Sequence, residues 1–254
     1  MPPMREPSAV GVTATPGSGG NTTLTMAGTL DDSTYRQVRD SVISAALAVP
    51  TAVLVDVSAL RVPADSGWTA FTSARWHVST WPGVPVLLVC DDPAGRAAIA
   101  RCGAARFVPV HPDPASAVAA TGAAGHPRRR VAADLEGDRD SLPRVRKLVA
   151  RWLTRWDRPQ LVHTASTVAS VFVENVLEHT ADRPRLVLEA TDDRVTVAVS
   201  DGSPDPAVRQ EDSVSGAHTV SGLAIVAALS RSWGSTPAAD GKTVWAVLGP
   251  ENRL

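Results

Sequence analysis

The chain has 254 residues, of which 44% are hydrophobic and 20% are charged. This length suits one large domain or two of ordinary size, and the apolar content supports proper hydrophobic cores. The 25 Lys and Arg residues are matched by 26 Asp and Glu residues, so we expect no nucleic-acid partner. The chain has neither an apolar run of about 18 residues nor the core of a signal peptide, so we expect no membrane partner and a cytoplasmic location.

Cysteine and histidine usage argues against a metal centre built from these residues. Cys90 and Cys102 lack metal-ligand spacing, so they are expected to be reduced thiols. The six histidines are scattered, without partners at the spacing of a zinc site.

The first half alternates short β-rich runs with helical runs, which is typical of an α/β layer structure. A helix is predicted over residues 31–48, where apolar residues recur at the helical period after an Asp/Ser start. Another is predicted over residues 93–103, with Pro93 near its start and Gly103 at its end. The expected strands cover residues 8–15, 21–28, 51–58, 84–91 and 106–111, and the expected helices cover 31–48, 66–81 and 93–103.

The stretch over residues 119–130, "AATGAAGHPRRR", consists of small residues that favour a flexible chain, followed by basic residues, and has no periodic apolar pattern. It predicts a linker. We therefore expect a first domain over residues 8–120, a linker over 121–130 and a second domain over 131–254.

The second half has a different order of elements. Long helices at 141–156 and 160–180 follow a strand at 130–137, and strands 185–191 and 194–201 are separated by "DD", a hairpin signal. A Gly/Pro/Ser/Asp-rich loop, a helix over 219–233 and a last strand over 242–248 complete the chain. This order favours an α+β domain with helices on one face of a sheet.

The segment "TAVLVDVSALRVPADSGWTAF" predicts a strand, a short loop and then Ser66-Gly67 at a helix start. The plain reading of Ser66 is an N-cap, whose oxygen satisfies a free backbone N–H. The functional reading is a phosphorylation switch, because phosphate adds roughly 1.5 to 2 negative charges where the helix dipole tolerates them.

This arrangement resembles the STAS domain of anti-anti-sigma factors, over residues of about 10–120. The resemblance implies an α/β fold with a mixed sheet, and it makes Ser66 the phosphoacceptor position. Where that family has Asp then Ser, this chain has Ala64 then Asp65. Trp68 replaces the usual small residue, and we leave open whether it is an interface anchor or a core residue.

The stretch "VFVENVLEHT" places polar residues inside an apolar, β-branched helix. At 100° per residue, Asn175 shares a stripe with Val171, Glu178 and His179, while Glu174 points away. An Asn carbonyl oxygen is a ligand that Mg²⁺ accepts beside nucleotide phosphates. Asn175 is therefore a candidate metal ligand, although a solvated Asn is the commoner case.

Further candidates for a nucleotide site follow in order along the chain. Asp201 at a strand end can accept a hydrogen bond from an adenine exocyclic amine, and Gly202 permits close backbone approach. Gly222 at a helix start can offer backbone N–H groups to phosphate, and Thr243 can add a hydroxyl. Each also has a structural alternative: Asp201 as a turn former, Gly222 as a helix-packing residue and Thr243 as a strand residue.

From about residue 130 onward, these segments resemble a GHKL (Bergerat-fold) ATPase domain of the anti-sigma-factor serine kinases. "ENVLEHT" matches its N-box at Asn175 and His179, and "VSDGSP", "SGLAIVAALSRSWG" and "GKTVWAVL" match its later motifs. The resemblance implies ATP and Mg²⁺ as cofactors, bound weakly or only vestigially. The expected fold is then an α/β STAS domain followed by an α+β GHKL sandwich.

The departures from that family concern its chemistry. The catalytic carboxylate of the family stands four residues before the Asn, where this chain has Val171. Glu174 is only a weak substitute, because the helix turns it off the line to Asn175. Ser203 and Val220 replace customary glycines, so the sequence favours a pseudokinase without a catalytic residue of its own.

Three functions stay open at this point. The first is a partner-switching regulator of sigma-factor control, whose partner is a sigma factor, an anti-sigma factor or another STAS or kinase-like regulator. The second is an active serine kinase that phosphorylates Ser66 or another STAS protein, with Glu174 or Glu178 as base. The third is a scaffold with both sites inactive. Homodimer formation is left open.

Overall fold

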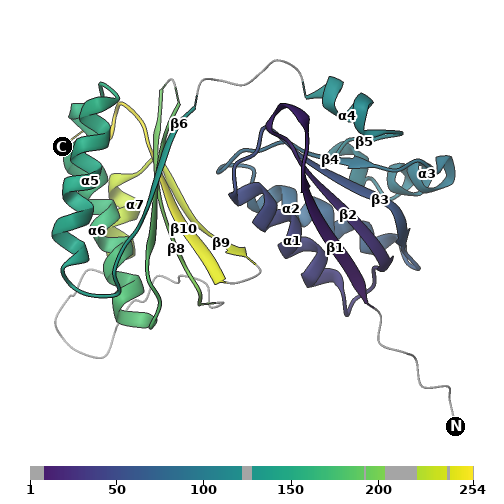
Figure 1. Cartoon of the computed structure of the whole chain (residues 1–254), viewed down its shortest axis with the longest axis horizontal. Coiled ribbons are helices and arrows are strands. Elements are labelled where there is room, and N and C mark those ends of the chain that lie inside the picture. Colours follow the sequence, from purple (N-terminus) through teal and green to yellow (C-terminus); the bar gives the residue numbers. More distant parts are fainter. Residues whose placement is uncertain (1–8, 122–127, 192, 204–221, 239–240, 254) are drawn as a thin grey trace, which may run out of the picture. The chain divides into compact units, whose positions relative to one another are not determined.

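The computed structural model describes residues 9–121, 128–191, 193–203, 222–238 and 241–253. The chain divides into two compact units, Met1–Gly125 and His126–Leu254 (Figure 1). Each unit has a five-stranded sheet and a hydrophobic core of its own.

The sheet of the first unit is mixed, in the order β1-β2-β3-β4-β5. Strands β1 and β2 pair antiparallel, whereas β2, β3, β4 and β5 run parallel to one another. The elements are β1 (Val10–Pro16), η1 (Ser18–Gly20), β2 (Thr22–Thr29), α1 (Tyr35–Leu47), β3 (Val53–Arg61), η2 (Asp65–Trp68), α2 (Thr69–His77), β4 (Val86–Val89), α3 (Pro93–Arg101), η3 (Ala104–Arg106), β5 (Val110–His111) and α4 (Pro114–Ala120).

Both faces of the central strands are covered, which explains their nearly continuous apolar sequences. Val53 and Val55 of β3 belong to the main core with residues of α1, α2 and α3. Leu54, between them, belongs to a smaller cluster with Ala117 of α4. The side chains of β3 therefore alternate between two helical layers.

The second unit has a fully antiparallel sheet in the order β6-β7-β8-β10-β9. Helices α5, α6 and α7 cover one face of this sheet (Figure 1). The elements are β6 (Arg129–Asp134), α5 (Ser141–Arg155), η4 (Pro159–Leu161), α6 (Val162–His179), β7 (Arg185–Ala190), β8 (Val195–Asp201), α7 (Gly222–Leu229), β9 (Ser232–Ala238) and β10 (Gly241–Leu248).

The core of the second unit lies between the helices and the sheet. Alternate residues of β8 and β10, such as Val197, Val199 and Val244, face the helices and belong to this core. Ala165, Phe172 and other residues of α6 recur at the helical period and pack against them.

Several expectations agree with this architecture. The mixed sheet of the first half is confirmed, and the second half has a separate antiparallel sheet in which β7 and β8 pair as a hairpin. Asp92 caps α3 through the N–H groups of Ala94 and Gly95, and Gly103 follows that helix at φ 82°.

Two element boundaries differ from the sequence prediction. The helix expected over residues 219–233 ends at Leu229, and residues 232–238 form the edge strand β9. Gly234 leaves room for the ring of Trp245 on β10, because a Cβ at Gly234 would lie 2.7 Å from that ring. The strand expected over residues 106–111 is reduced to Val110–His111. β6 begins at Arg129, within the range expected for the linker.

Candidate functional site

Ser66 lies in the turn η2, which follows the carboxyl end of β3. The N-cap of η2 is Ala64, and the hydroxyl of Ser66 makes no hydrogen bond with a described residue. The backbone carbonyl of Ser66 accepts the hydroxyl of Thr69 at 2.6 Å. Ser66 is exposed, so the N-cap reading does not account for its side chain.

The two residues after Ser66 are buried and fix the turn to the core. A Cβ on Gly67 would lie 2.8 Å from Val62 Cγ1 and 3.3 Å from the carbonyl oxygen of Leu30, so the close packing requires glycine. Trp68 is 5% exposed, and its ring centroid lies 6.0 Å from that of Phe71. Trp68 is therefore a core residue and not an exposed interface anchor.

Six acidic residues lie in the segments that follow the parallel strands, at the same end of the sheet as Ser66. Because β2, β3, β4 and β5 are parallel, the segments that follow them meet at the same edge. Those segments contain Asp31, Asp32, Asp65, Asp91, Asp92 and Asp113. Asp92 and Asp113 cap helices there, and hydrogen bonding from Ser116 lowers the pKa of Asp113. We call this surface the acidic edge.

In the second unit, α6 carries the polar stretch identified from the sequence. Glu174, Glu178 and His179 are exposed, and Asn175 is half-buried. The carboxamide of Asn175 makes no hydrogen bond with a described residue. Among the described residues, no group of three or more His, Cys, Asp or Glu side chains could hold a metal ion.

Val171 packs against the start of α7. Its side chain is 8% exposed, and a Cβ on Gly222 would lie 2.8 Å from its Cγ1. The residue that replaces the family's carboxylate is thus part of the core and brings α6 and α7 into close contact. This contact joins two predicted site segments by apolar packing.

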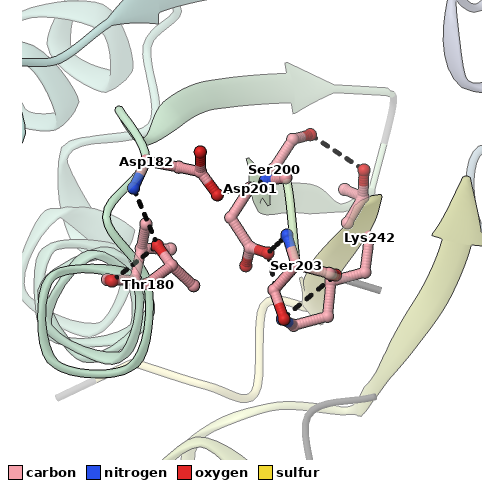
Figure 2. A network of polar contacts seen from close by, with 9 residues as sticks. Thr180, Asp182, Ser200, Asp201, Ser203 and Lys242 are labelled. Carbon is pink, nitrogen blue, oxygen red and sulfur yellow. Dashed lines mark hydrogen bonds and ion pairs between the residues drawn. The ribbon is translucent and has the colours of Figure 1, made fainter. Parts of the chain in front are cut away.

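Asp201, at the end of β8, forms an ion pair and a hydrogen bond with other residues of the chain (Figure 2). Its Oδ1 accepts Lys242 Nζ at 3.0 Å and the N–H of Ser203 at 2.8 Å. The exposed fractions of the Asp201 and Lys242 side chains are 3% and 11%. Lys242 lies directly opposite Asp201 in the antiparallel register, at the same end of the sheet.

Two other predicted site residues also have partners within the chain. The N–H of Gly202 donates to Asp182 Oδ2 at 3.1 Å, and a Cβ on Gly202 would lie 2.8 Å from that oxygen. The hydroxyls of Thr243 and Ser200 lie 2.8 Å apart. Thr243 and Asp201 belong to alternate residue pairs of the register, so their side chains lie on opposite faces of the sheet.

The structure therefore places Asp201 and Gly202 together at the β8 end, and it places Gly222 beside Val171. It does not bring Thr243 to the carboxylate of Asp201. Val220 lies outside the described residues, and so do residues 204–216 of the loop predicted over 202–216.

Lys242 and Asp182 are site residues that sequence reasoning missed. The signal for Lys242 was available, because it is one of only two lysines in the chain. In addition, it stands two residues before the core residue Val244, on the face that turns toward the helices. Asp182 carries no comparable signal, since it follows α6 in an irregular segment.

Comparisons with known proteins identify the first unit. Residues 13–117 match the family model of the STAS domain. The first unit is therefore a STAS domain, built on the mixed sheet described above. No curated protein matches the chain. Within the described residues, no helix has the length and apolarity needed to cross a membrane.

Three solved structures are similar to parts of the chain. An anti-sigma factor antagonist from Mycobacterium paratuberculosis is 18% identical, covers 44% of this chain and 94% of its own, and has a TM-score of 0.38. The anti-sigma factor antagonist SpoIIAA in its unphosphorylated form is 14% identical, covers 45% and 100%, and has a TM-score of 0.36. The RsbU and RsbW domains of a Mycobacterium tuberculosis protein are 20% identical, cover 48% and 32%, and have a TM-score of 0.33.

Proposed function

We propose that the chain is a regulatory partner-switching protein of sigma-factor control. The observation that carries the proposal is the exposed, uncapped hydroxyl of Ser66 in a STAS domain. Phosphorylation there would add roughly 1.5 to 2 negative charges to the acidic edge. A partner that packs over Ser66 would have to bury this charge beside Asp65, and the desolvation cost would weaken docking without a change in the fold.

The second unit is proposed to act by binding proteins and not by phosphoryl transfer. Its motifs resemble a GHKL serine kinase, yet the position of the catalytic carboxylate holds the buried Val171. A valine cannot accept a proton from a serine hydroxyl, and Glu174 is exposed on another side of the helix.

The surface of α5 supports a protein partner of this unit. Four basic side chains lie on one helical face, because their spacings are three, four and four residues. The helix contains no acidic residue. These residues are Arg144, Lys147, Arg151 and Arg155, all exposed and without an ion pair to a described residue. Such a stripe is complementary to an acidic protein surface.

The proposal is tested with the purified chain, Mg²⁺ and radiolabelled ATP. Alone, the chain should incorporate no phosphate, because it lacks the base. With an active serine kinase of the anti-sigma type added, the chain should be labelled, and Ser66→Ala should remove the label. Ser33→Ala is the matched control, since Ser33 is an exposed serine in the segment that follows β2.

Two outcomes would decide against this function. Labelling of Ser66 by the chain alone would favour the second candidate, an active kinase, and loss of the label in Glu174→Ala or Glu178→Ala would identify its base. An absence of labelling at Ser66 with every active kinase of this type would favour the scaffold with both sites inactive.

A further inference from the structure

We infer that the Lys242 side chain takes the place of the base at Asp201 in the candidate nucleotide site. Its ion pair with Asp201 keeps the second unit free of nucleotide. The residues at the β8 end do not fit a nucleotide as they stand. Asp201, the carboxylate that would recognise the base, is instead the counter-ion of a lysine from the neighbouring strand (Figure 2).

The backbone conformation at the start of β10 positions the two residues of this ion pair. Gly241 begins β10 with a φ of 140°, a conformation that other residues rarely adopt. A Cβ on Gly241 would clash with the carbonyl oxygen of Asp201, so glycine allows the start of β10 to lie against the end of β8. The register then sets Lys242 opposite Asp201.

A base has poor access to Asp201 while Lys242 is in place. Oδ1 already accepts two hydrogen bonds, so the free lone pairs are those of Oδ2, and the Asp201 side chain as a whole is only 3% exposed. Because the Lys242 side chain is only 11% exposed, displacement would leave an ammonium group without its counter-ion in a largely dry position. Removing one partner of a buried pair is strongly unfavourable.

The groups around the pair are also satisfied from within the chain. The backbone carbonyl of Ser203 lies 3.5 Å from Lys242 Nζ, and Asp182 accepts the N–H of Gly202. Asp182 is itself positioned by Thr180, whose hydroxyl accepts the Asp182 N–H at 3.2 Å (Figure 2). The end of β8 is thus held by polar contacts before any ligand arrives.

The inference rests on the proposed function in one respect, the likeness of the second unit to a nucleotide-binding fold. Its test is separate, because nucleotide binding is measured without Ser66, a kinase or a partner. Failure of Ser66 labelling would leave the binding result intact, and the reverse also holds.

The experiment is a titration of ATP and Mg²⁺ into the full chain by isothermal calorimetry, together with thermal shift. The wild-type chain should show no saturable binding up to millimolar ATP. Lys242→Ala frees Asp201 and should bind ATP saturably, with a Kd at least tenfold below the highest ATP concentration at which the wild type shows no saturation. Lys242→Arg keeps the positive charge and is the matched control, which should behave like the wild type.

Two results would overturn the inference. One is Lys242→Ala that is folded by circular dichroism yet binds ATP no better than the wild type. The other is saturable micromolar binding of ATP to the wild-type chain that Asp201→Asn abolishes. The second result needs only the wild-type chain and a variant of similar shape, so it stands even where Lys242→Ala does not fold.

Discussion

Lys242 and Asp201 face each other across the β8–β10 register, with Nζ and Oδ1 3.0 Å apart. Because both side chains are largely buried, each single replacement should leave its partner uncompensated. We expect Asp201→Asn and Lys242→Met each to lower the free energy of unfolding by about 3 kcal/mol. The double variant should lose less than the sum, with a coupling energy of about 1–3 kcal/mol. Urea denaturation of the four proteins measures this cycle.

A surface pair provides the comparison. Arg185 Nη1 and Asp134 Oδ1 are 2.8 Å apart, but both side chains are more than half exposed. Solvent screening should keep the effect of Asp134→Asn below about 1 kcal/mol. Equal losses at the two pairs would show that the buried pair has no special role.

Gly67→Ala should destabilise the STAS domain by about 1–3 kcal/mol, because the new Cβ meets Val62 and the Leu30 carbonyl. Gly11→Ala is the matched control, since its only neighbour within 4 Å is a carbonyl oxygen at 3.8 Å. Thermal unfolding followed by circular dichroism compares the two. A loss at Gly11 as large as that at Gly67 would refute the packing argument.

Val171→Glu restores the carboxylate of the family but should not create a kinase. The new charge would be buried beside Gly222, at a cost of roughly 3 kcal/mol in stability, and Asp201 would still be paired. Glu174→Ala, on the exposed side of the same helix, should change stability by less than about 0.5 kcal/mol. Radiolabel transfer and urea denaturation measure both variants, and rapid transfer by Val171→Glu would contradict this expectation.

Glu251 should titrate well below its usual range. Hydrogen bonds from Arg231 Nε and Nη2, at 2.7 and 2.9 Å, lower the pKa of Glu251 from 4.5 to about 2. Because the folded-state pKa is depressed, the pair contributes stability above pH 4.5 and loses it as the pH falls toward 2. Carboxyl NMR should show this titration, and Arg231→Gln should return it toward 4.5. An unshifted Glu251 in the wild type would refute the ion pair.

Much of the fold follows from local sequence patterns. The parallel strands read as continuous apolar runs, and Asp92, Pro93 and Gly103 mark the ends of α3. The same kind of signal, Asp113 followed by Pro114, marks the start of α4, a helix that was not predicted. The sequence predicts helix and loop where β9 lies, because the place of β9 depends on pairing with β10, a long-range contact that local patterns do not encode.

The candidate sites also differ in how much of them local sequence patterns predict. Ser66 could be located from its strand, loop and helix start, and the buried state of Trp68 could not be chosen from sequence alone. Asp201 could be singled out as a carboxylate at a strand end, but its partner could not. The pairing with Lys242 depends on the β8–β10 register and on the conformation of Gly241, which only the folded chain supplies.

The central claim, that the charge state of Ser66 controls partner docking, is tested most directly by one affinity measurement. Biolayer interferometry would compare wild type, Ser66→Ala and Ser66→Glu for binding to an immobilised serine kinase of the anti-sigma type. We predict similar affinities for the wild type and Ser66→Ala and at least a tenfold loss for Ser66→Glu, because docking over Ser66 would have to desolvate the added carboxylate beside Asp65. Equal affinity of all three proteins would contradict the account.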